Sequence, residues 1–425
     1  MKRIVLATFG SLGDVHPYIA IALDLQRRGH QPVIATSDVH RTSIEAAGVR
    51  YAPMRPHAEH LGDPAVLVRR LFHPTQGPRY LIREVVMPHL RGAYDDLERA
   101  CAGADLLVSH PLTFGARLVA EKRGLPWRSS VLSPISVMSY IDPPLFGPAP
   151  WLQWIRRLGV APYRSVFSAV KRMVGRWEQP LHTLRAELGL PPLPHAQFEG
   201  QYAPGGTLAL FSRVLATPQS DWPPRTTLCG FSRYDGAAPD ASAQRALDDF
   251  LGGGAPPIVF TLGSSVSMYA SDFFRTAIES TRRLGQRALL ITGQDPGEYD
   301  AAIAAARLPR GAIRVMRYLP YSAAFAHAAV NVHQGGIGTL AQALAAGRPQ
   351  LVTPVAFDQP DNAQRAVRLG VARSIPFQKL SATRMTAALR TLLAAPAYRD
   401  AATAIARVVI EEEQAQRAAA LLAAG

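Results

Sequence analysis

A glycine-rich turn in the C-terminal half of the chain has the residue types that bind a phosphate group. Its glycines let the backbone come close to a ligand, and the helix expected after it offers unpaired N–H groups and the positive end of a helix dipole. A threonine hydroxyl and a histidine or glutamine side chain can donate further hydrogen bonds. The same pattern also fits an ordinary strand-to-helix turn with a threonine cap and a packed histidine. The residues are His333, Gln334, Gly335, Gly336, Gly338 and Thr339.

A second polar turn, at 354–362, also stands between a predicted strand and a predicted helix. Asp358 and Gln359 bring acceptor oxygens and an amide donor to it, a set that suits the hydroxyl groups of a sugar. An isolated Asp-Gln pair is more typical of a helix cap. Taken together, the two turns place phosphate donors and hydroxyl acceptors on neighbouring turns of one domain, which is the arrangement that a nucleotide-sugar needs.

The hydrophobic pattern predicts the scaffold that positions these turns. Short apolar, β-branched runs alternate with amphipathic stretches, the pattern of a parallel sheet covered by helices on both faces. We therefore predict an α/β fold with two doubly wound, Rossmann-like domains that face a cleft. Ligands in such sheets collect at the carboxyl ends of strands near a switch point. The predicted strands are 3–9, 33–36, 105–109, 127–131, 258–262, 287–292, 313–316, 330–333, 349–353 and 371–375.

Proline-rich stretches divide the chain. Prolines crowd into 134–150, a largely helical stretch covers 151–189, and a second proline-rich connector covers 218–239. In the first half, helices are expected at 40–47, 79–102 and 115–123. We predict an acceptor-binding domain at 1–217, a linker at 218–240 and a donor-binding domain at 241–425, whose last helix can pack back on the first domain.

Composition narrows the classes of function. The chain has 425 residues, 48% of them hydrophobic, and 46 Lys plus Arg against 32 Asp plus Glu, for a net charge of +14. This composition indicates a globular protein, and the positive charge indicates an anionic partner. We do not expect that partner to be nucleic acid, because the sequence has no block of cations typical of a nucleic-acid-binding tail.

Cysteine spacing and hydrophobic runs bear on the location of the protein. Cys101 and Cys229 do not have the spacing of metal ligands or of a disulfide framework. The first apolar run ends too early for a signal peptide, and no run approaches the length of a membrane span. We expect a cytoplasmic location, including the inner face of the membrane.

The motifs resemble a known family. The letters HQGGIGT, then Gly347-Arg348-Pro349, then P-x-x-x-D-Q-x-x-N are similar to the donor signature of family 1 glycosyltransferases with the GT-B fold. Segment 10–17, GSLGDVHP, looks like the first acceptor-domain loop of that family. Stretches 221–223, 259–264 and 333–338 look most like bacterial rhamnosyltransferases of rhamnolipid synthesis, with sterol and macrolide glucosyltransferases as more distant relatives. The resemblance covers nearly the whole chain and is weakest at 50–200.

The resemblance implies roles for individual residues. Ser264, His333 and the rest of the HQGGIGT turn would hold the diphosphate of a UDP- or dTDP-sugar. Asp358 and Gln359 would hold the sugar, which would be rhamnose or glucose. Tyr318 stands where the family often has an aromatic residue that stacks on the nucleotide base.

Two departures from the family pattern leave the donor open. Gln334 stands where many bacterial members have a second histidine, and it can donate a hydrogen bond but cannot become a cation. Ala341 stands where plant members have an acidic ribose ligand. Its neighbour Gln342 could replace that ligand only with a neutral hydrogen bond, which is weaker than a bond to a carboxylate.

Inverting glycosyl transfer requires a base that deprotonates the acceptor hydroxyl as it attacks the anomeric carbon. Asp14 occupies the position where the family carries its catalytic histidine or, in some bacterial branches, aspartate. His16 competes, because the ordinary pKa of a histidine suits the task better than that of an aspartate. We favour Asp14 and keep His16 as the alternative. Either residue, next to Pro17, also fits a simple helix cap.

No cofactor or metal is expected, because no ligand cluster or D-x-D motif stands near the predicted site. The acceptor is expected to be a hydrophobic molecule with a hydroxyl group. The segment 151–177 combines tryptophans with six cations, which suits either peripheral contact with an anionic membrane or a solvated basic face whose tryptophans pack inward.

Two other functions compete with glycosyl transfer. A nicotinamide-dependent oxidoreductase is suggested by Gly10 and Gly13 after the first strand, but the G-x-G-x-x-G motif is absent and no acid ends the second strand. A glycosyltransferase-like protein without catalysis, acting as a partner or sensor, is the second alternative. The presence of Asp14, His16 and Asp358-Gln359 counts against it.

Overall fold

The chain folds into two α/β units. The computed structural model describes residues 1–424 except 74, 194, 264–269 and 415. The first unit is Met1–Tyr234 together with Glu412–Gly425, and the second is Asp235–Glu411. The division after Tyr234 lies inside the stretch that the sequence analysis assigns to the linker.

The first unit is built on a parallel sheet of seven strands. The sheet order is β3-β2-β1-β4-β5-β6-β7, so the chain reverses its direction of winding between β1 and β4. Buried aliphatic residues fill its central strands because both faces are covered. The strands are β1 (Arg3–Ala7), β2 (Gln31–Thr36), β3 (Arg50–Pro53), β4 (Leu106–Ser109), β5 (Trp127–Val131), β6 (Thr207–Ala209) and β7 (Thr226–Leu228).

The second unit has a parallel sheet of six strands in the order β10-β9-β8-β11-β12-β13, with its switch point between β8 and β11. Each strand matches a predicted one to within a residue at either end. The strands are β8 (Ile258–Thr261), β9 (Ala288–Ile291), β10 (Ile313–Met316), β11 (Val330–His333), β12 (Gln350–Val352) and β13 (Ala372–Ser374).

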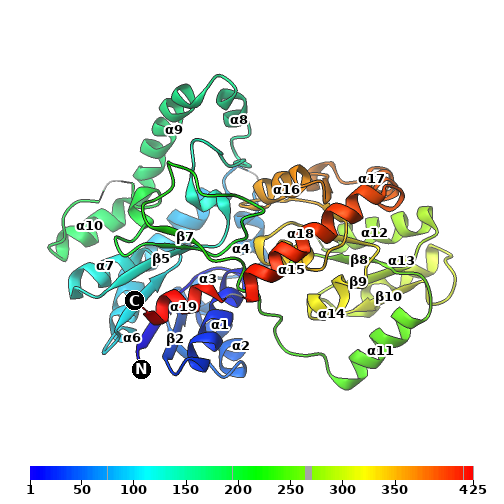
Figure 1. Cartoon of the computed structure of the whole chain (residues 1–425), viewed down its shortest axis with the longest axis horizontal. Helices are drawn as coiled ribbons and strands as arrows, with labels where there is room; N and C mark the ends of the chain where they lie inside the picture. The colour runs from blue at the N-terminus through cyan, green and yellow to red at the C-terminus, as the bar shows by residue number, and fades with distance from the viewer. Residues whose placement is uncertain (74, 194, 264–269, 415, 425) are drawn as a thin grey trace. The chain divides into compact units, whose positions relative to one another are not determined.

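Helices connect the strands in both units (Figure 1). In the first unit, α19 contacts α1, so the C-terminal helix packs beside the first helix of the chain. The helices of the first unit are α1 (Leu12–Arg27), α2 (Arg41–Ala46), α3 (Ala58–Leu61), α4 (Pro64–Leu71), α5 (Gly77–Tyr80), α6 (Leu90–Ala100), α7 (Phe114–Arg123), α8 (Trp151–Arg156), α9 (Val160–Gly175), α10 (Gln179–Glu187) and α19 (Arg417–Ala424). Those that begin in the second unit are α11 (Ala241–Gly252), α12 (Ala270–Leu284), α13 (Asp300–Ala305), α14 (Tyr321–Phe325), α15 (Ile337–Ala345), α16 (Gln359–Arg368), α17 (Ala382–Ala394) and α18 (Pro396–Gln414).

The structure departs from the predicted elements in the first unit. The helix expected over 79–102 is broken into α5, a π-helical turn at Leu81–Val86, a 3₁₀ turn at Met87–His89, and α6. Pro88 causes part of this break because it has no N–H for the helical ladder. Strands β3, β6 and β7 were not predicted, and β7 lies within the expected linker as the edge strand of the first sheet.

In the described residues, no helix is long and apolar enough to cross a bilayer.

Candidate active site

Two turns at the carboxyl ends of β11 and β12 lie side by side in the second unit. The amide of Asn362 joins them: its Nδ2 donates to the carbonyl of Gly335 at 3.0 Å and to Oδ2 of Asp358 at 2.7 Å. Oδ2 of Asp358 also lies 3.3 Å from the N–H of Ile337, which is the first residue of α15. Asn362 is fully buried in α16. The turn at 333–339 and the turn at 354–362 therefore form one surface, as the sequence analysis expected.

Gly335 gives the first turn its shape. Its φ is +87°, and a Cβ at this position would lie 2.6 Å from Cγ1 of the buried Val352 on the neighbouring strand. Only glycine fits both conditions. The chain can then start α15 at once, with Gly336 as an N-cap residue that has no side chain to accept from the first-turn N–H groups. Gly336 and Gly338 are the half-buried residues of this turn, so the backbone at this helix N-terminus is accessible to a ligand.

His333 lies behind the turn, and its side chain is fully buried. Its Nδ1 accepts the N–H of Gly335 at 3.1 Å, and its Nε2 lies 3.1 Å from Oε1 of Gln350. Because Nδ1 accepts, the ring proton sits on Nε2 and points to Gln350. Burial lowers the pKa of His333 to about 4, although the hydrogen bond with Gln350 acts in the opposite direction. The ring is therefore neutral at pH 7 and orients the turn from inside the domain.

This buried histidine makes the stability of the protein depend on pH. In the unfolded chain the ring binds a proton as the pH falls through about 6.5, whereas in the folded chain it stays neutral down to about 4. Its contribution is therefore complete above pH 6.5 and is lost as the pH falls below that value. We expect His333→Asn, whose side-chain oxygen can still accept from Gly335, to remove about 2 kcal/mol of the difference in unfolding free energy between pH 7 and pH 5. Urea titrations at both pH values measure this difference, and an unchanged difference would contradict the assignment.

Gln334 presents an incompletely paired amide to the same surface. Its side chain is 3% exposed, its Nε2 lies 3.4 Å from Oγ1 of Thr339, and its Oε1 is buried without a partner among the described residues. The two ends of an amide are assigned from the hydrogen-bond network, so either end can be the unpaired one. A buried polar atom without a hydrogen-bond partner costs free energy, so it indicates a further group that forms a hydrogen bond with it. Ser264, the other residue expected at this turn, lies outside the described residues.

Asp358 and Gln359 lie at the start of α16 after a strained residue. Phe357 has a φ of +57°, which is rare for an aromatic residue and typical of functional turns. Oε1 of the buried Gln359 accepts the N–H groups of Val355 at 2.8 Å and Ala356 at 3.3 Å. The glutamine therefore fixes the turn with one end of its amide, and only Nε2 can donate to a ligand.

Tyr318 and Gln342 converge on residues at the start of the second unit. The side chain of Gln342 is nearly buried, and its Nε2 donates to Oδ1 of Asp235 at 2.8 Å. The hydroxyl of Tyr318 donates to the carbonyls of Asp235 at 3.0 Å and Ala237 at 3.3 Å, while the residue as a whole is 50% exposed. This arrangement brings a carboxylate next to Gln342.

In the first unit, Asp14 lies at the N-terminus of α1 beside the ends of β1 and β4. Its Oδ2 accepts the N–H of Ser11 at 2.7 Å and the hydroxyl of Ser11 at 3.0 Å, which completes a capping box. Its Oδ1 lies 3.6 Å from Nε2 of His110, the residue that follows β4. Nδ1 of His110 accepts the N–H of Leu112 at 3.2 Å, so the ring directs its Nε2–H at Asp14.

The surroundings of Asp14 favour its ionised form. Burial by itself raises the pKa of this carboxyl, but the hydrogen bond and electrostatic attraction of His110 and the bonds from Ser11 outweigh it and hold the pKa below its ordinary value. His16 lies two residues further along α1, where its ring meets the edge of Tyr234 at a centroid distance of 5.2 Å. The structure therefore separates the two competitors: Asp14 is paired with a histidine, and His16 packs against an aromatic ring.

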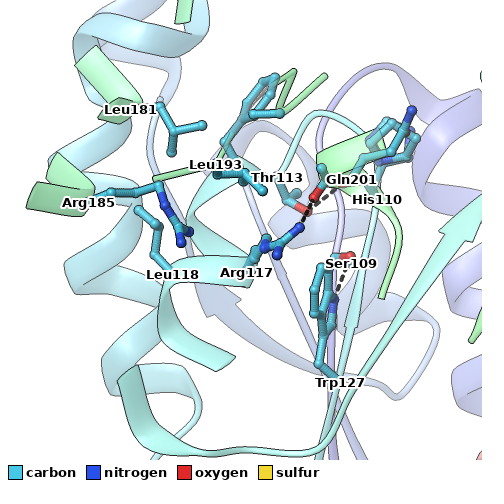
Figure 2. A pocket seen from close by; sticks show the side chains of 14 residues that line it. Ser109, His110, Thr113, Arg117, Leu118, Trp127, Leu181, Arg185, Leu193 and Gln201 are labelled. Carbon is cyan, nitrogen blue, oxygen red and sulfur yellow. Dashed lines mark hydrogen bonds between the residues drawn. The ribbon is translucent and has the colours of Figure 1, made fainter. Parts of the chain in front are cut away.

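A pocket beside the end of β4 shows how His110 is supported (Figure 2). The indole Nε1 of Trp127 donates to Oγ of Ser109 at 2.8 Å, which fixes the last residue of β4. Arg117 lies over the indole at 5.6 Å and donates to the carbonyl of Gly200 at 2.8 Å. Oγ of Ser130 also donates to the carbonyl of Ser109 at 2.8 Å, so two residues of β5 fix the strand end that His110 follows.

Three residues of this site were not predicted. Asn362 was visible as the last letter of the P-x-x-x-D-Q-x-x-N motif, and His110 as a histidine directly after a predicted strand. No sequence motif pointed to Asp235, because it lies in the segment 218–240 that we predicted to be a linker. Within the described part of the chain, no group of three or more His, Cys, Asp or Glu side chains has the arrangement of a metal site.

Two family descriptions match the two ends of the chain. Residues 4–135 match "Glycosyltransferase family 28 N-terminal domain", and residues 299–423 match "Erythromycin biosynthesis protein CIII-like, C-terminal domain". The first match contains Asp14 and His110. The second contains both turns of the second unit.

Known proteins resemble the chain over its whole length. Glycosyltransferase GtfE of Amycolatopsis orientalis is 30% identical over 99% of this chain and 97% of its own length. O-mycaminosyltylonolide 6-deoxyallosyltransferase of Streptomyces fradiae is 28% identical over 99% and 96%. The crystal structure of glycosyltransferase VinC in complex with dTDP superposes with a TM-score of 0.67 at 19% identity, covering all of both chains.

Proposed function

The chain belongs to the family 1 glycosyltransferases with the GT-B fold, and from this we propose that it transfers a hexose from a UDP- or dTDP-sugar to a hydroxyl group of a hydrophobic acceptor, with inversion at the anomeric carbon. Membership in this family excludes the nicotinamide-dependent oxidoreductase that the sequence analysis kept as an alternative. The nucleotide of the donor, the sugar, the acceptor and the stereochemistry of the transfer are what we propose beyond membership in the family.

The observation that carries the proposal is the pair of turns joined by Asn362. One turn presents an accessible helix N-terminus and the incompletely paired amide of Gln334, which suits the two phosphates of a donor. The other presents Asp358 and Gln359, which suit the hydroxyl groups of the sugar. Asn362 fixes the two turns relative to each other, because its amide donates to the carbonyl of Gly335 at 3.0 Å in one turn and to Asp358 at 2.7 Å in the other.

The nucleoside would be bound further along α15. Tyr318 would stack on the base, and Gln342 would face the ribose together with the carboxylate of Asp235. In this proposal Asp235 supplies the negative charge that Ala341 lacks, and the acid comes from another segment of the chain. A carboxylate accepts ribose hydroxyls more strongly than a neutral amide does.

The chemistry is a single displacement. The acceptor hydroxyl gives its proton to the carboxylate of Asp14, its oxygen bonds to the anomeric carbon, and the bond from that carbon to the diphosphate oxygen breaks with its electron pair. His110 positions Asp14 through Nε2. The helix dipole of α15 and the donors of its turn stabilise the departing diphosphate.

The proposal of a hydrophobic acceptor rests on the relatives of this chain. The relative from Streptomyces fradiae is named for an O-mycaminosyltylonolide acceptor.

The test is release of nucleoside diphosphate from a panel of UDP- and dTDP-hexoses, with and without a hydroxylated macrolide or sterol aglycone. We expect acceptor-dependent release from one base class, and slow hydrolysis of the same donor without acceptor. Asp235→Asn should raise KM for that donor about 5–10-fold with little change in kcat, because it removes one charge-assisted hydrogen bond. Asp249→Asn, on the exposed face of α11, is the matched control. Neither release nor hydrolysis with any donor would favour the inactive, partner-binding alternative.

A further inference from the structure

The helix α8 exposes an apolar face that the fold does not use. Trp151, Trp154 and Leu158, which we call the tryptophan face, are 51%, 63% and 63% exposed. Their spacing places them on one side of α8 and its last turn. The other side is anchored, because Leu152 is buried in the aromatic cluster around Tyr163 and Phe167. The alternative that these tryptophans pack inward is therefore wrong.

The exposure is specific to these two tryptophans. Trp127 and Trp222 are buried, and Trp177 is half-buried against the core. A tryptophan normally buries a large apolar area, so two exposed tryptophans with a neighbouring leucine form an apolar patch of the kind that marks an interaction site. The exposed Val160 at the start of α9 extends the face.

The segment that carries the tryptophan face is rich in cations, and Arg157 lies within the face's own sequence. The segment 151–177 contains six Lys or Arg residues and no Asp or Glu. Arg156 and Lys171 are used internally, on the carbonyl of Tyr140 and on Glu199. Arg157, Arg172 and Arg176 are exposed, and none of them has an ion pair with a described carboxylate.

We propose that the tryptophan face docks on an anionic lipid surface. Tryptophan and leucine side chains insert at the boundary between headgroups and acyl chains, and flanking arginines contact anionic headgroups. A second copy of this chain is a poor occupant, because a symmetric interface on this face would bring the same unpaired arginines together. The docking would hold the enzyme where apolar hydroxylated molecules partition.

The experiment is vesicle co-sedimentation of the full-length protein. We expect binding to vesicles of phosphatidylglycerol and phosphatidylcholine, little binding to phosphatidylcholine alone, and a blue shift of tryptophan emission on binding. Trp151→Ser with Trp154→Ser should lower the partition coefficient at least tenfold, because two large apolar side chains no longer enter the bilayer. Arg172→Gln with Arg176→Gln should weaken binding and make it less dependent on salt.

The controls separate docking from folding and from catalysis. Val367→Ser removes an exposed apolar side chain of the second unit and should partition like the wild type. Diphosphate release with a water-soluble acceptor should be unchanged in the tryptophan variant. The proposal is overturned if the tryptophan variant binds vesicles like the wild type. It is also overturned if light scattering shows dimers that depend on Trp151 and Trp154, or if the face binds nucleic acid in preference to vesicles.

Discussion

Asp14→Asn is expected to lower acceptor-dependent turnover by about 10²–10⁴-fold, the usual contribution of a general base. Asparagine has nearly the same shape as aspartate, and its side-chain oxygen can still accept the N–H of Ser11, so the capping box at the start of α1 survives. What is lost is the ability to take a proton. Donor KM and thermal unfolding should therefore change little while kcat falls. Steady-state kinetics at saturating donor, together with a melting curve, measure both quantities.

His16→Ala provides the comparison, with an expected loss of less than tenfold. The pH dependence separates the two bases further. Because the pKa of Asp14 lies below its ordinary value of 3.8, kcat should stay flat down to about pH 4 in the wild type. His110→Ala removes the hydrogen bond and electrostatic attraction that lower the pKa of Asp14, so the acidic limb of the pH profile should move to higher pH. A kcat that falls below pH 6.5 and a large loss in His16→Ala would transfer the role of base to His16.

The second sheet was predictable because its strands are strongly patterned. Its six strands lie in short, mostly apolar runs bounded by glycine or proline, although β10 and β13 each contain an exposed arginine, so the sequence pattern identifies each one. The first sheet was less predictable at its edges. β3 and β7 lack the buried apolar run of the predicted strands, because none of their residues is fully buried, and β7 follows two prolines. Such edge segments become strands through pairing with a neighbour, as Thr207 of β6 does with Thr226 of β7, and local sequence does not encode that pairing.

The candidate site also has features that the sequence predicts and features that depend on tertiary packing. The turns at 333–339 and 354–362 were expected together because each follows a strand that ends at the same edge of a parallel sheet. His110 was not expected, because its contact with Asp14 depends on β4 lying next to β1 across the switch point. The buried position of His333 was also not visible from the sequence. A histidine beside glycines suggests a ligand contact, whereas its bonds to Gly335 and Gln350 depend on how β11 and β12 pair.

Gly335→Ala is expected to have the largest effect on the second unit. The alanine would have to adopt a φ near +87° and would place its Cβ 2.6 Å from Cγ1 of Val352. The backbone strain costs about 1–2 kcal/mol, and the overpacking costs about 1–3 kcal/mol because Val352 is fully buried and cannot move aside. We therefore expect a loss of about 2–5 kcal/mol in unfolding free energy and a donor affinity too weak to saturate. Urea unfolding and titration with the nucleoside diphosphate check the two effects.

Gly285→Ala in the same unit isolates the strain from the clash. Gly285 also has a positive φ, of +61°, but a Cβ there meets nothing within 4 Å, so the loss should stay near 1–2 kcal/mol with donor affinity intact. A double-mutant cycle makes the argument sharper: Gly335→Ala should cost less in a Val352→Ala background than in the wild type, since the smaller side chain removes the contact. Equal costs in both backgrounds would mean that Val352 does not shape the turn. Asn362 connects the turn at 354–362 to the turn at 333–339 by its hydrogen bond to the carbonyl of Gly335. Unchanged donor affinity in Gly335→Ala would therefore mean that the phosphates of the donor bind elsewhere.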